Sequence, residues 1–127
     1  MIKIWTVQLC WHRYAKSQDI HVLNITAATG IQAFAPDYRA LWRYKYNEIN
    51  DIEYTRLYIE RMQHSLKSFP EEWDKLGQHE RVAVACYCTA GKFCHRHLFV
   101  PLMENKLEAL GLECEYMGEL APPPKEK

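Results

Sequence analysis

The chain has 127 residues and a mass of 15.0 kDa, with 48% hydrophobic and 25% charged residues, which is enough for one compact core. Sixteen basic residues balance sixteen acidic ones, so no net charge attracts nucleic acid or anionic lipid from a distance. The sequence has neither the ~20-residue apolar run that spans a bilayer nor the apolar stretch of a secretory signal. We therefore expect a single-domain protein that stays in the cytoplasm and does not bind membranes.

The first half of the chain alternates strand and helix patterns. Residues 2–9 and 20–25 are rich in β-branched and aromatic side chains, which is typical of strands. The small residues of 26–30 predict a loop that can pass close to a ligand. Two helices follow, one over 37–46 after a proline and one over 52–66 after an Asn-Asp cap.

The second half centres on a strand of small apolar residues. Residues 81–88 are apolar enough to be buried on both faces, which predicts a strand in the middle of the sheet. A helix is expected over 94–110, where Pro101 must either kink it or lie near its start. Residues 112–117 are expected to form the last strand. The predicted core stripe of the last helix consists of Leu98, Leu102, Met103, Leu107 and Leu110.

Strands that alternate with helices indicate an α/β domain with a mostly parallel sheet, because a parallel pair of strands needs a helical crossover. We expect one small domain over residues 1–120, with helices flanking the sheet, and a disordered polar tail at 121–127. In such domains, ligands bind at the carboxyl ends of the strands. The end of the strand at 81–88 and the start of the next helix are therefore the predicted location of a site.

Three of the five cysteines fall within nine residues at this location, which favours thiol or metal chemistry over a disulfide framework. Cys88 is predicted at the strand end. Cys94 is predicted at the helix start, where the helix dipole and nearby cations favour its thiolate. His95 would orient or deprotonate the thiol, so Cys94, Cys88 and His95 are the predicted catalytic residues. Cys86, within an apolar strand, fits a core position equally well.

A phosphate group is the predicted ligand of this region. The turn between Cys88 and Cys94 leads into the free N–H groups of a helix start, which commonly bind anions, and Arg96 would hold phosphate. The small-residue loop would form the opposite lip, with side chains of two helices reaching in. The predicted ligand-binding residues are Arg96, Lys92, Gly91, Thr26, Thr29, Gly30, Lys45, Tyr54 and Tyr58.

Two other interpretations stay open, and one is excluded. The cysteine-x5-arginine loop of phosphatases and rhodaneses is excluded, because position 94 holds cysteine where arginine is required. Aromatic and cationic residues interleave at 11–14 and 42–44, a pattern that can bind nucleic acid but packs cores more often. A zinc site is the other interpretation, although zinc ligands usually come from two separate loops. Its ligands would be Cys86, Cys88, Cys94 and His95.

The motif Cys86-Tyr87-Cys88, followed by Phe93-Cys94-His95-Arg96, resembles one branch of the DUF488 family of uncharacterised domains. Many members of that family have glutamate two residues after the first cysteine, where this chain has Cys88. The Cys-x-Cys pair followed by Cys-His is also similar to the motif of a second uncharacterised family, DUF4326. The resemblance to the DUF488 branch extends to Ile25-Thr26 with Gly30, Phe34-Ala35-Pro36, Lys45, Tyr54 to Tyr58, and Gly118-Glu119.

The resemblance to both families implies a Rossmann-like domain and a nucleotide or nucleotide-derived ligand. The leading hypothesis is an enzyme or binder of a phosphate-bearing small molecule that uses the cysteine, histidine and arginine site and needs no cofactor. The alternatives are a zinc-stabilised binding module and a non-enzymatic protein that binds a nucleotide or nucleic acid.

Overall fold

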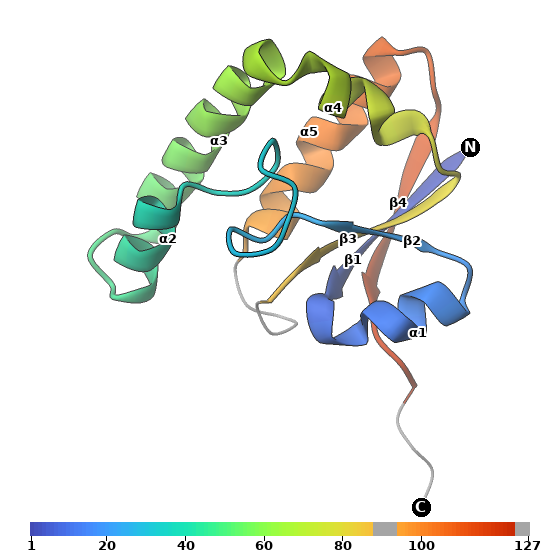
Figure 1. Ribbon diagram of the computed structural model, residues 1–127, viewed down its shortest axis with the longest axis horizontal. Helices are drawn as coiled ribbons and strands as arrows, with labels where there is room; N and C mark the ends of the chain where they lie inside the picture. The colour runs from blue at the N-terminus through green and yellow to red at the C-terminus, as the bar shows by residue number, and fades with distance from the viewer. Residues whose placement is uncertain (88–93, 124–127) are drawn as a thin grey trace, which may run out of the picture.

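The computed structural model describes residues 1–87 and 94–123, which form a four-stranded sheet with helices on both faces (Figure 1). The strand order is β2-β3-β1-β4, and every neighbouring pair is parallel. This confirms the predicted α/β class and the central position of the strand that carries Cys86. The strands are β1 (Ile2–Gln8), β2 (His21–Asn24), β3 (Arg81–Cys86) and β4 (Cys114–Leu120).

Helices cover the two faces of the sheet unequally. Three of them, α3, α4 and α5, lie on one face, and α1 lies on the other (Figure 1). The sequence patterns predicted α2, α3 and α5 but not α1 or α4, which are too short to show a helical period. The helices are α1 (His12–Ser17), α2 (Tyr38–Lys45), α3 (Asp51–Ser68), α4 (Pro70–Asp74) and α5 (His95–Ala109), with 3-10 turns η1 (Leu9–Trp11) and η2 (Lys75–Gly77). No helix among the described residues is both long and apolar enough to cross a membrane.

Side-chain caps fix the helix boundaries. The carboxylate of Asp37 accepts a hydrogen bond from the backbone N–H of Ala40 at the start of α2. The side chain of Asn50 caps α3 in the same way, accepting from the N–H of Glu53. At the end of α5, Gly111 adopts a φ of +78°, which closes a helix without steric cost because glycine lacks a Cβ.

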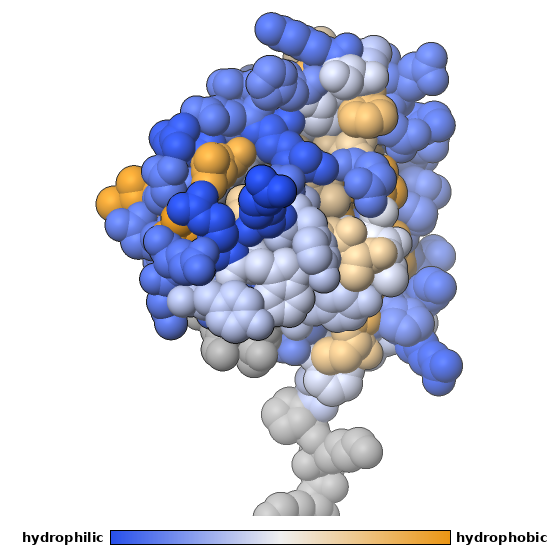
Figure 2. Space-filling view, turned by 60° about the vertical axis from the view of Figure 1, so that its left-hand side comes forward, coloured by the Kyte–Doolittle hydropathy of each residue, from blue (hydrophilic) through white to orange (hydrophobic). Residues whose placement is uncertain are grey.

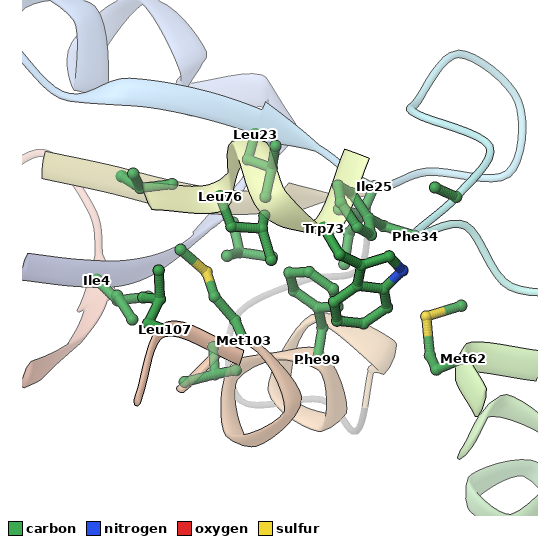
Figure 3. Packing of buried hydrophobic residues seen from close by; sticks show 14 of the residues in the cluster. Ile4, Leu23, Ile25, Phe34, Met62, Trp73, Leu76, Phe99, Met103 and Leu107 are labelled. Carbon is green, nitrogen blue, oxygen red and sulfur yellow. The ribbon is translucent and has the colours of Figure 1, made fainter. Parts of the chain in front are cut away.

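The larger core lies between the sheet and α3, α4 and α5 (Figure 3). Trp73 of α4 is fully buried there against Phe34 and Phe99. Its indole N–H donates to the Ser65 hydroxyl at 2.9 Å, so the polar atom is satisfied inside an apolar cluster. The smaller core, under α1, consists of Val7, Ala15, Ile20, Ala83 and Ala85.

The buried face of α5 differs from the predicted stripe. Met103 and Leu107 are buried as expected, but Leu98 and Leu102 are only partly buried and Leu110 is exposed. The buried face of the helix is shifted by one residue from the predicted stripe. Pro101 is the seventh residue of the helix and lies in its interior rather than near its start. Because the stripe is displaced, it includes charged and titratable residues. The buried residues are His95, Arg96, Phe99, Val100, Met103 and Leu107.

A β-bulge in β4 decides which face its last residues meet. Tyr116 pairs with Ile4 of β1, but the next residue of β1 pairs with Gly118, so Met117 is an extra residue in the ladder. Gly118 adopts a φ of +109°, a backbone conformation that is unfavourable for residues other than glycine. Because side chains alternate along a strand, the extra residue turns Glu119 toward α5. Without the bulge, Glu119 would face α1.

Candidate functional site

The candidate site lies where β3 ends and α5 begins, at the carboxyl edge of the sheet. Val82 and Val84 of β3 face the α5 side of the sheet, and the two-residue period places Cys86 on the same side. Cys94 is the N-cap residue of α5, with extended backbone angles. Cys86 and Cys94 are each at most 2% exposed, so the two thiols lie inside the protein.

The sulfur atoms of Cys86 and Cys94 are in direct contact, as in a disulfide. Their Cα atoms are 7.9 Å apart, beyond the range of about 4.4 to 6.8 Å that is usual for disulfides. The sequence favoured Cys88 and Cys94 as the important pair and regarded Cys86 as possible core. The described structure pairs Cys94 with Cys86, and Cys88 lies outside the described residues.

Arg96 is completely buried beside this cysteine pair. Its guanidinium donates to both carboxylate oxygens of Glu119, at 3.2 Å from Nε and 3.1 Å from Nη2. The third edge of the group, Nη1, donates to the sulfur of Cys86 at 3.0 Å. Glu119 therefore compensates the buried cation, and the Cys86 sulfur occupies the remaining edge of the guanidinium.

His95 is oriented by a backbone carbonyl. Its Nε2 lies 2.8 Å from the carbonyl oxygen of Ile25, and because a carbonyl can only accept, Nε2 carries the proton. Burial lowers the pKa of His95 to about 4, the Ile25 bond opposes this shift, and the charges of Arg96 and Lys45 lower it further. The ring is therefore neutral near pH 7, and its free Nδ1 faces the sulfur of Cys94 at 3.6 Å.

The loop after β2 holds that carbonyl in place. The Thr26 hydroxyl lies 3.0 Å from the Thr29 hydroxyl and accepts the Thr29 backbone N–H, and the Asn24 side chain accepts the N–H of Thr26. A Cβ on Gly30 would come within 2.6 Å of the Thr26 carbonyl oxygen, so only glycine fits this turn. Thr26, Thr29 and Gly30 are thus used in fixing the loop that presents Ile25 to His95.

The predicted residues of α2 and α3 surround the same end of α5. The Tyr58 ring lies 5.5 Å from the His95 ring, and its hydroxyl donates to the Phe34 carbonyl at 2.8 Å. Tyr54 is buried and stacks on Tyr44 at 4.6 Å. Lys45 is exposed, and its charge contributes to the lowered pKa of His95. Their predicted contact with a ligand stays a prediction.

The structure brings Cys94, His95 and Arg96 together with Cys86, Glu119 and the carbonyl group of Ile25. Cys86 was predicted only as a core residue or as a zinc ligand. Glu119 and the Ile25 carbonyl appeared only as parts of the family resemblance. The contact of Arg96 with phosphate stays a prediction; three of its N–H groups face Glu119 and Cys86. The predicted ligands Gly91 and Lys92 lie outside the described residues.

Three kinds of chemistry are compatible with these atoms. A neutral histidine beside a cysteine can accept the thiol proton and produce a nucleophile. Two adjacent thiols can form and break a disulfide. The ligand atoms of Cys86, Cys94 and His95 also lie within 4.8 Å of one another, close enough to share a metal ion.

Comparison with known proteins gives a family but no characterised relative. Residues 2–107 match the family model DUF488-N3a, described as the active DUF488-N3 subclade. Neither the curated proteins nor the solved structures contain a significant match to the chain.

Proposed function

Since the chain belongs to the DUF488 family, in the subclade described as active, we propose that it is an enzyme that attacks a nucleotide-type, phosphate-bearing substrate with a thiol. The observation that supports this most directly is the geometry of His95. Its Nε2 proton is committed to Ile25, so its Nδ1 lone pair is directed at Cys94. This is the relation between a base, its orienting group and a nucleophile that activates cysteine in enzymes.

In the proposed reaction, Nδ1 of His95 takes the proton of the Cys94 thiol, and the sulfur forms a bond to the electrophilic centre of the substrate. The leaving group departs with its electron pair and receives the proton from His95. Water, giving its proton to Nδ1 of His95, would then displace the bound group from the Cys94 sulfur, and that proton would return to the thiolate. Cys86, whose sulfur accepts a hydrogen bond from Arg96, lies beside Cys94 and would hold it in place. The chemistry needs reduced thiols at both positions.

A phosphate-bearing substrate is supported by the charges at the edge of the site. The first turn of α5 contains no acidic residue, and the Cys94 side chain makes no capping hydrogen bond. The positive end of the helix dipole and Lys45 therefore both favour an anion at this edge. An anion here would also offset the effect of the Lys45 charge on His95 and raise the pKa of His95 from its lowered value. Substrate binding would thereby strengthen the base.

Selective alkylation tests the proposed nucleophile. In the reduced protein, we expect iodoacetamide to label Cys94 faster than Cys10 or Cys114. Mass spectrometry measures the labelling rate of each cysteine from pH 5 to pH 9, in steps of ~1 unit, which suffice to resolve a thiol titration. Burial raises the pKa of Cys114, which makes it a slow internal reference. His95→Gln is expected to slow Cys94 labelling at least about tenfold by removing the base.

His97→Gln is the matched control, because His97 lies two residues along the same helix and its pKa is also lowered by burial. It should leave Cys94 labelling unchanged. The same samples are titrated with nucleoside mono- and diphosphates by calorimetry. Cys94 labelling no faster than that of Cys10, with no heat from any nucleotide, would remove the proposal. The predicted second thiol, Cys88, is read out in the same mass spectra.

A zinc-stabilised site is the second candidate, and the convergence of Cys86, Cys94 and His95 is the observation that favours it. Their donors are two sulfurs and one nitrogen, and the predicted fourth ligand is Cys88. If this candidate is correct, purified protein contains about one zinc per chain, and chelation lowers the melting temperature. Metal-free protein with an unchanged melting temperature in the presence of a chelator would exclude it.

A further inference from the structure

The outer face of α2 exposes a row of three aromatic rings. Tyr38, Trp42 and Tyr46 are 58%, 39% and 71% exposed, at four-residue spacing. Neighbouring ring centroids lie 5.9 and 5.7 Å apart, and the rings of Trp42 and Tyr46 are nearly parallel. The opposite side of the helix supplies the packing, through buried Ala40 and through Tyr44, which stacks on Tyr54. The outer row is therefore not needed to attach α2 to the fold.

Cations accompany the exposed rings. Arg39, Arg43 and Lys45 are exposed on the same short helix, which contains no acidic residue. Lys45 places its ammonium 5.3 Å from the centre of the Trp42 ring. Of the nearby acids, Asp37 is occupied in capping the helix, and Glu48 lies 3.7 Å from Arg43. A locally positive surface thus exists on a chain that has no net charge.

We propose that this face of α2 binds single-stranded nucleic acid. Unpaired bases would stack on Tyr38, Trp42 and Tyr46, while the phosphates between them would meet the cationic side chains. Rows of aromatic rings beside cations are characteristic of single-strand sites, because every base has a face that can stack. A duplex hides its bases, and cations on a helix without acidic residues are matched best by the phosphates of a strand. The side of the molecule that carries α2 and α3 is predominantly hydrophilic (Figure 2).

The same face leads toward the candidate site. Tyr44 of α2 stacks on Tyr54 of α3, and Tyr58, one turn further along α3, lies 5.5 Å from the His95 ring. A strand bound on α2 can therefore deliver one of its nucleotides to Cys94, which would make the substrate part of a strand rather than a free nucleotide. This last step rests on the proposed function, whereas the α2 surface stands without it.

Fluorescence anisotropy with labelled oligodeoxythymidine and oligouridine dodecamers tests the surface. We expect Trp42→Ala to weaken binding at least about tenfold, since stacking of one base on an aromatic ring has a large effect on affinity. Tyr46→Ala provides a second substitution at an even more exposed position. The double variant Arg39→Gln with Arg43→Gln should weaken binding and flatten the dependence of log K on log salt by about 1 to 2, because about 0.7 counterion is released per phosphate.

Two matched controls make the result specific. Trp11→Ala removes a tryptophan of similar exposure, 38%, from η1 beside α1 and should change affinity less than about twofold. Arg56→Gln removes an exposed arginine of α3 that is already paired with Glu53 and Glu60, and should leave the salt dependence unchanged. An equal loss from Trp11→Ala, tight binding of a duplex, or no binding at low salt would each overturn the proposal.

The alkylation assay separates this inference from the proposed function. Trp42→Ala should leave the rate of Cys94 labelling unchanged. Binding that depends on Trp42, in a protein whose Cys94 reacts no faster than Cys10, would refute the proposed chemistry and support the surface. Fast Cys94 labelling that depends on His95, without oligonucleotide binding, would refute the surface and support the chemistry.

Discussion

Replacing Glu119 by glutamine is expected to lower the free energy of unfolding by about 3 kcal/mol, the lower end of the range for breaking a buried ion pair. Arg96 is completely buried, and Glu119 accepts two of its hydrogen bonds. Glutamine keeps the shape of the side chain but removes the charge that compensates the guanidinium inside the protein. Because the Glu119 side chain is 24% exposed, solvent screens part of the loss. Urea denaturation measures the change.

Glu60→Gln is the matched control for this prediction. Glu60 accepts from Arg56 at 2.7 Å, a shorter contact than either bond between Arg96 and Glu119. The side chains of Arg56 and Glu60 are both about half exposed, so we expect a much smaller loss than for Glu119→Gln. The comparison isolates burial, since contact distance alone would rank the two pairs in the opposite order. Similar losses for the two variants would contradict the assignment of Arg96 and Glu119 as the electrostatic support of the site.

The sequence was sufficient to predict the layers of this fold. Apolar runs such as that of β3 and capping residues such as Asp37 and Asn50 act locally, so strand and helix positions follow from short windows. The parallel sheet then follows from the alternation of strands and helices. The buried face of α5 was predicted less well, because apolar residues occur on several sides of that helix and only tertiary contacts select among them.

The site was predictable in its residues but not in its pairings. Cys94 and His95 are adjacent in sequence, so a helix start was enough to predict their contact. The partner of Arg96 was not predictable, because Glu119 reaches it only through the bulge at Met117. Without that bulge, the side chain of Glu119 would point to the other face of the sheet. The choice of Cys86 as the neighbour of Cys94 likewise depends on how β3 and α5 meet in space.

The stability of the protein should depend on pH through His95. Burial lowers its pKa from 6.5 to about 4, so the folded state resists protonation that the unfolded chain accepts readily. The stabilisation by the neutral ring is therefore complete above pH 6.5 and is lost as the pH falls toward 4. A difference of that size between the folded and unfolded pKa corresponds to about 3 kcal/mol at pH 4. Urea denaturation at pH 7 and pH 4 would measure the loss.

His95→Gln isolates this contribution, since an amide keeps an N–H donor for the Ile25 carbonyl and does not titrate. The variant is less stable than the parent protein at pH 7, but its unfolding free energy should fall by about 3 kcal/mol less between pH 7 and pH 4. His21 and His97, whose pKa values burial also lowers, are present in both proteins and cancel in the comparison. Parallel pH profiles for the two proteins would mean that His95 is not held neutral by the fold. The base proposed for Cys94 would then be protonated in acid like an exposed histidine, and its Nδ1 would not be kept free to accept the thiol proton.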